Sequence, residues 1–139
     1  MANVIYTSFK KGIGDGTFDM DADTFKCALL TSSHTPNAAN SVLADVSANE
    51  VSGTGYTAGG ATLADVTWAI DGTTCVLDAA DPEWTGSTIT ARYAAIYKSG
   101  TANSLTNPLV CLLDFEEDKG VTGGTFSVQF NTGGIVVLS

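Results

Sequence analysis

Basic side chains are scarce in this sequence, and their scarcity excludes partners that carry many phosphates. Only 6 of the 139 residues are Lys or Arg, against 15 Asp or Glu, so the formal net charge is -9 at pH 7. Such a charge repels the phosphates of DNA, RNA and anionic lipid headgroups. We therefore expect no nucleic-acid partner and no membrane partner, and expect that the acidity steers the chain toward basic protein surfaces.

Long apolar runs and paired cysteines are also missing. No run of about 18 apolar residues is available to cross a bilayer, and no basic region followed by an apolar one opens the chain. We expect synthesis in the cytoplasm. Cys27, Cys75 and Cys111 are odd in number and lie far apart within apolar runs, where cysteine behaves as a small hydrophobe. They are predicted to be reduced core residues.

Histidine is nearly absent, which removes most catalytic and metal-binding arrangements. His34 is the single histidine and lies among Ser, Thr, Pro and Asn, with no neighbouring Cys or His to share a zinc ion. None of the three cysteines lies in a nucleophile signature that would need this histidine as its base. We expect a surface histidine, no catalytic residue, no cofactor and no enzyme activity.

Apolar residues and glycine, by contrast, are plentiful. The chain is 44% hydrophobic and 15% charged and contains 15 Gly, a composition typical of a folded protein rich in turns. Its length fits a single domain over residues 1–139. Within it, residues 1–16 are predicted to form an N-terminal arm or a short helix. The apolar residues there have roughly helical spacing before glycines interrupt it, and include Val4, Ile5, Tyr6 and Phe9.

Short runs with strand patterns fill most of the remaining chain. They cover residues 25–31, 62–70, 73–79, 88–98, 109–115, 125–130 and 135–138. Asp71 and Gly72 separate two of these runs and are the strongest signal for a β-hairpin. The last two runs are expected to pair with each other, and residues 41–51 to form a short helix. The fold predicted is all-β: an antiparallel β-sandwich or jelly-roll-like domain with one or two short helices.

The stretch GTGYTAGG, residues 53–60, raises the question of a phosphate-binding loop. That loop needs a buried strand before it and a helix after it, so that the phosphate meets the helix N-terminus. Here the expected helix comes first and the strand pattern follows. A structural turn is the better interpretation, because glycine allows positive φ. The predicted turn residues are Gly53, Gly55, Tyr56, Gly59 and Gly60.

Acidic residues upstream of residue 25 resemble the start of a calcium-binding loop. The carboxylates are Asp19, Asp21 and Asp23. An EF-hand is excluded because Thr24 replaces the required glycine and Leu30 replaces the bidentate glutamate. A looser calcium site that also uses Asp15 stays open, beside the alternative of a solvated acidic loop.

A second acidic run and the aromatic residues offer two further possibilities. Asp114, Glu116, Glu117 and Asp118 include the paired carboxylates that glycoside hydrolysis needs, but residues 116–119 are predicted to be an exposed strand end. Trp84 follows Asp-Pro-Glu and is the aromatic residue expected to be most exposed, where it would stack on a sugar or a partner.

The opening segment, the strand FKCALL and the block ANEVSGTGYTAGGATL resemble small structural proteins of tailed bacteriophages. The resemblance implies a non-enzymatic virion protein, made in the host cytoplasm. Its nearest role is that of a capsid decoration or cement protein, which binds the major capsid protein as a dimer or trimer. A tail or head-tail joining protein is the competing role, and a carbohydrate-binding receptor module is the alternative from another class. The expected interface residues are Val4, Ile5, Tyr6, Phe9 and Trp84, unless the arm packs on its own core.

Overall fold

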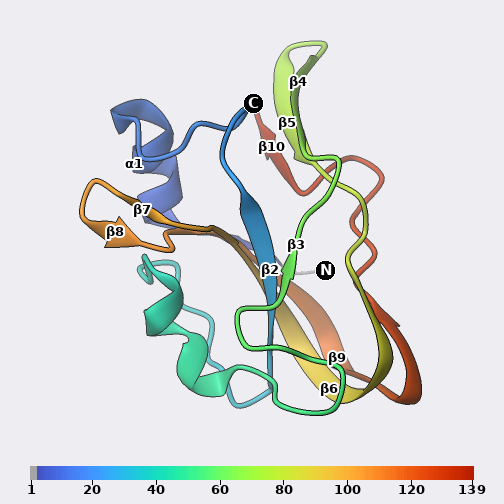
Figure 1. Cartoon of the computed structure of the whole chain (residues 1–139). Helices are drawn as coiled ribbons and strands as arrows, with labels where there is room; N and C mark the ends of the chain where they lie inside the picture. Colours follow the sequence, from blue (N-terminus) through green and yellow to red (C-terminus); the bar gives the residue numbers. More distant parts are fainter. Residues whose placement is uncertain (1–2) are drawn as a thin grey trace.

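Two long antiparallel strands organise the fold in the computed structural model, which describes residues 3–139 (Figure 1). They are β6 (Glu83–Lys98) and β9 (Leu109–Ser127). The half of β6 from Ala91 to Tyr97 is almost entirely buried, as expected of a strand covered on both faces. These two strands form the middle of a five-stranded sheet with the order β1-β9-β6-β2-β3.

Three shorter strands complete this sheet, and of these β2 is the one that the sequence pattern predicts along its whole length. β2 (Phe25–Leu30) pairs along its whole length with β6, and its side chains from Cys27 to Leu30 are fully buried. β3 (Ala61–Thr62) adds two residues to the other edge of β2. β1 (Val4–Ile5) pairs with β9. The small hairpin of β7 (Thr101–Ala102) and β8 (Leu105–Thr106) connects β6 to β9.

A second sheet contains the hairpin that the Asp71-Gly72 pair predicts. β4 (Thr67–Asp71) and β5 (Thr74–Asp78) are joined by a turn at Gly72 and Thr73, and β10 (Val136–Leu138) completes the order β10-β5-β4. Gly72 has φ +65°, which glycine adopts without strain. Leu77 and Val136 are buried in the same hydrophobic core as the five-stranded sheet. The fold is therefore all-β and sandwich-like with antiparallel sheets, as predicted.

Three expectations about elements are wrong. Residues 125–130 do not pair with residues 135–138, because residues 125–127 are the end of β9 and β10 pairs with β5 instead. Residues 62–70 are not one strand: the chain leaves β3, passes Leu63 and enters β4 only at Thr67. The helix expected at 41–51 consists of two short 3-10 turns, η1 (Leu43–Asp45) and η2 (Ser47–Asn49).

The N-terminal segment is a short helix that belongs to the core. α1 (Thr7–Asp15) ends at Gly16, which adopts a left-handed conformation. Tyr6 and Phe9 are 0% and 1% exposed, and the Phe9 ring contacts that of Phe18 edge-on at 5.0 Å between centroids. Of the two alternatives left open by the sequence, the structure has the short helix packed on its own core, so Tyr6 and Phe9 are not the exposed interface residues expected of an arm. Their apolar surface is already covered by the chain's own core.

The cysteines are free thiols, as predicted. Cys27 and Cys111 are buried, and burial raises the pKa of both thiols, that of Cys111 to about 12. Cys75 on β5 is only half-buried. Buried thiols of this kind act as small apolar side chains.

Candidate functional site

The glycine-rich stretch at residues 53–60 forms turns, the structure predicted for it, and these turns lie on β2 and β6. A Cβ on Gly60 would lie 1.8 Å from the backbone oxygen of Cys27, so no other residue fits there. The adjoining Gly59 N–H donates a hydrogen bond of 2.7 Å to the carboxylate of Glu50. The stretch leads into β3 and not into a helix, so it lacks the helix N-terminus of a phosphate site.

Tyr56 anchors this turn. Its hydroxyl donates to Glu50 and accepts a 2.9 Å hydrogen bond from the Leu29 N–H. Burial raises the pKa of the phenol, and the hydrogen bond to Glu50 adds to the effect. The hydroxyl is therefore neutral at physiological pH and fixed between β2 and the loop.

A row of aromatic rings runs from Tyr56 to the far strand. Tyr56 lies 5.9 Å from Trp84, Trp84 lies 6.1 Å from Phe126, and Phe126 lies 6.4 Å from Phe115, measured between ring centroids. Trp84 is only 6% exposed, so the expectation of an exposed, sugar-stacking tryptophan is wrong. The ring of Tyr56, a turn residue, packs against it. The row instead supports the floor of a surface groove.

A large bulge in β9 creates that groove. Tyr93 pairs with Asp114 and Ala91 pairs with Lys119, so residues 115–118 of β9 are opposed by the single residue Arg92. The extra residues leave the sheet, and Glu116 adopts φ +68°. The acidic run is thus the middle of a long strand, and the expectation of a strand end is wrong.

The carboxylate of Asp114 holds the base of the bulge. It accepts a 2.8 Å ion-pair hydrogen bond from Arg92 Nε and a 2.7 Å hydrogen bond from the Glu116 N–H. Partial burial opposes ionisation of Asp114, but these donors outweigh it and hold its pKa below the usual value. The same contact raises the pKa of Arg92. Asp114 is therefore occupied structurally and does not present a free carboxylate.

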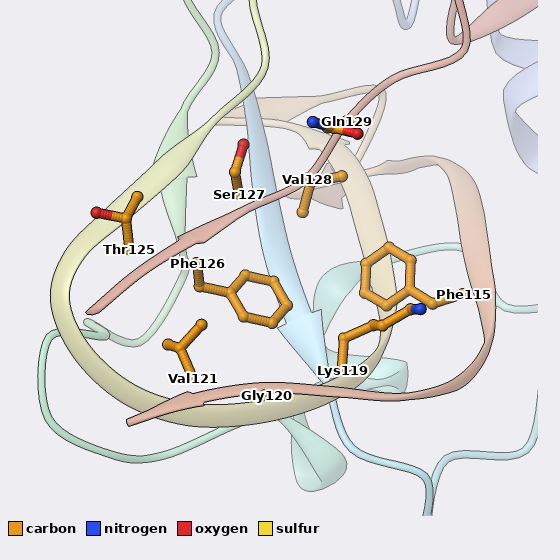
Figure 2. A pocket seen from close by; sticks show the side chains of 9 residues that line it. All are labelled: Phe115, Lys119, Gly120, Val121, Thr125, Phe126, Ser127, Val128 and Gln129. Atoms are coloured by element: carbon orange, nitrogen blue, oxygen red, sulfur yellow. The ribbon is translucent and has the colours of Figure 1, made fainter. Parts of the chain in front are cut away.

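The groove lies between the bulge and the end of β9 and has a volume of about 450 Å³. Figure 2 shows the rings of Phe115 and Phe126 beside each other, with Val121 and Lys119 along the border. Phe126 and Val128 are nearly buried and form the floor, whereas Phe115 and Val121 are half-buried. An open, mainly apolar groove of this kind suits a partner's apolar side chain.

The bulge beside the groove carries carboxylates, whereas the charged residue that lines the groove itself is Lys119. Glu116, Glu117 and Asp118 are all exposed on the bulge. Lys119 forms a 2.6 Å ion pair with Glu117, and that contact lowers the pKa of the glutamate. Asp118 adds a further exposed carboxylate beside this pair, so the bulge next to the groove is acidic, which favours an approaching basic segment.

The aspartates considered for calcium do not converge. Asp19 and Asp23 accept backbone hydrogen bonds within their own turn, and Asp23 also forms a 2.9 Å ion pair with Lys98. Asp15 accepts hydrogen bonds from Lys11 and Thr17, which lower its pKa. Within residues 3–139 no group of three or more His, Cys, Asp or Glu side chains could hold a metal ion. The arrangement is that of a capped turn.

His34 is buried, so the expectation of a surface histidine is wrong. It is 6% exposed, and its ring contacts Tyr93 edge-on at 5.5 Å between centroids. Nε2 has no hydrogen-bond partner among residues 3–139, and burial lowers the pKa of the imidazole. The side chain is neutral at physiological pH and packs as an aromatic ring.

No protein family, curated protein or solved structure matches the chain. Among the described residues, no helix has both the length and the apolar character needed to span a bilayer. The surfaces of the fold itself are therefore what indicates a function. The groove was missed in the sequence, although two signals were present: an acidic run inside a strand pattern, and glycines at 120, 123 and 124 that permit irregular pairing.

Proposed function

We propose that this chain is a non-enzymatic structural protein of a tailed-bacteriophage particle. Its most specific role is that of a capsid decoration or cement protein, which binds the major capsid protein and assembles as a dimer or trimer on the shell. The resemblance of the opening segment and of the ANEVSGTGYTAGGATL block supports the virion class. The observation that carries the binding role is the mainly apolar groove on β9, which lies beside the acidic bulge.

The groove has the features of a protein-binding surface. Its floor is fixed by the aromatic row, which leads back through Trp84 to the turn at Tyr56, so that little ordering of the wall is needed on binding. Its apolar area is small. A single contact of this size is weak, but many copies on a lattice add such contacts into firm attachment.

A particle-binding experiment tests the proposal. Particles of the phage that encodes this chain are prepared without it, and the labelled recombinant chain is added back. We expect saturable binding at sites that electron microscopy locates on the shell. Val121→Asp puts a charge into the groove wall and is expected to weaken binding about tenfold or more, because it removes an apolar contact and adds an acidic group.

The matched control is Thr122→Asp, which adds the same charge at the exposed neighbouring residue outside the groove. It is expected to bind like the unchanged chain. Label on the tail or at the head-tail joint would assign the protein to those structures instead. Absence of binding to any part of the particle would reject a virion role.

A further inference from the structure

The three-stranded sheet carries an apolar row beyond the limit of the core. Ile70 pairs with Cys75 and Cys75 pairs with Leu138, so the three side chains lie side by side on one face. Ile70 is 83% exposed and Leu138 is 45% exposed. On the same face, two residues further along their strands and away from the hairpin turn, Leu77 and Val136 are buried. The row thus continues the core face outward without a covering element.

The outer edge of the sheet is open at β4. In the order β10-β5-β4, nothing pairs with the side of β4 that faces away from β5. Asp71 and Thr74 close the two-residue hairpin, so Trp68 and Ile70 direct their backbone N–H and C=O groups outward. Among the described residues no backbone hydrogen bond reaches these groups. Figure 1 shows the hairpin projecting past the rest of the fold.

The charge around this sheet has one sign. No Lys or Arg occurs between Lys26 and Arg92 or after Lys119, a span that includes β4, β5 and β10. The carboxylates on and beside the sheet are Asp65, Asp71, Asp78, Asp81 and Glu83. None of them takes part in an ion pair within residues 3–139. Lysine and proline are common protective residues on edge strands, and β4 has neither; its single charged residue is Asp71, next to the turn.

We propose that the β4 edge binds an extended segment of another protein, of alternating apolar and basic residues, as an additional antiparallel strand. The outward backbone groups of Trp68 and Ile70 would supply the ladder hydrogen bonds. Apolar side chains of the segment would extend the row of Ile70, Cys75 and Leu138. Its basic side chains would meet Asp71 and the other carboxylates of the sheet.

A second copy of this chain is the poorer occupant. Two copies that meet at β4 bring together two sheets that carry carboxylates and no basic residue, and like charges across an interface oppose association. The proposed site is separate from the groove on β9, since it uses different strands and different residues. A negative result for one of the two sites therefore leaves the proposal about the other site unaffected.

Fluorescence anisotropy with a labelled short peptide that alternates valine and lysine tests the site. We expect the full-length chain to bind it, and to bind a peptide that alternates valine and glutamate at least tenfold more weakly. Ile70→Asp should weaken binding of the lysine peptide about tenfold or more, because it removes the exposed centre of the apolar row. Ile70 is exposed, so the variant is expected to fold, which thermal unfolding checks.

Thr73→Asp is the matched control, since it adds the same charge to the hairpin turn outside the paired edge. It should bind the lysine peptide at least as well as the unchanged chain. Equal binding to Ile70→Asp, equal binding of the glutamate peptide, or no binding at all would overturn the proposal. So would sedimentation showing a dimer that Ile70→Asp dissociates, because the edge would then be occupied by a second copy.

Discussion

At the scale of single residues, His34 gives the fold a pH dependence of known sign. Burial lowers its pKa in the folded chain below the value of about 6.5 found in an unfolded chain. The unfolded chain then binds the proton more tightly. The free energy of unfolding is therefore highest above about pH 6.5. Below that pH it falls by about 1.4 kcal/mol per pH unit until the pH reaches the pKa of the folded chain.

The variant His34→Phe isolates this effect. Phenylalanine keeps an aromatic ring against Tyr93, and Nε2 makes no hydrogen bond that would be lost. Denaturant unfolding at about pH 7.5 and about pH 5 should show a loss of stability in the unchanged chain and little loss in the variant. Carboxylates with lowered pKa, such as Asp114, lose their contribution only near and below pH 4, outside this window. An equal loss in both chains would contradict the prediction.

At the scale of single residues, the local sequence is sufficient to predict turns but not to predict which side chains are buried. The turn at Gly72 and the bend at Gly60 were predictable, because positive φ is a property of the residue itself. The burial of His34 and Trp84 was not, because their neighbours in sequence are polar and their covers come from distant strands and loops. Tyr93 lies 59 positions from His34, and Phe126 lies 42 positions from Trp84. Local composition therefore does not predict such contacts.

At the scale of elements, α1 is an integral part of the core. Phe9→Ala should lower the free energy of unfolding by about 3–5 kcal/mol, because it removes a fully buried ring that packs on Phe18. Lys10→Ala, at the exposed neighbouring position, should change it by less than about 0.5 kcal/mol. Denaturant titrations measure both. If Phe9→Ala leaves stability unchanged, the segment is a separable arm after all.

Elements also show the limit of strand prediction. The alternating pattern located β2, β5 and most of β6, since each faces a core that the pattern records. It divided β9 into two strands, because the four-residue bulge after Asp114 interrupts the alternation with charged residues. The pairing of β10 with β5 depends on contacts between residues about 60 positions apart. No short-range signal in the sequence specifies the pairing of β10 with β5. A tight turn, in contrast, specifies the pairing of the two strands of a hairpin.

At the scale of the whole molecule, the two proposed surfaces lie on different sheets. Figure 1 places the β4–β5 hairpin at one end of the fold and the bend of β6 and β9, beside which the groove lies, at the other. The long strands between them form a paired ribbon with a well-packed core. A stiff body with a binding surface at each end can join two neighbouring subunits of a lattice, which is what a cement protein must do.

With two binding surfaces, binding of the chain to particles and stabilisation of the shell become two effects that can be measured separately. Under the proposed capsid role, occupied particles should resist heat-induced release of DNA, measured with a dye, better than particles without the chain. Val121→Asp and Ile70→Asp each leave one surface intact, so either variant should still occupy particles at high concentration yet give little protection. Thr122→Asp and Thr73→Asp should protect fully. Full protection by a single-surface variant at equal occupancy would show that one contact is sufficient, and that the chain stabilises the shell locally without bridging its subunits.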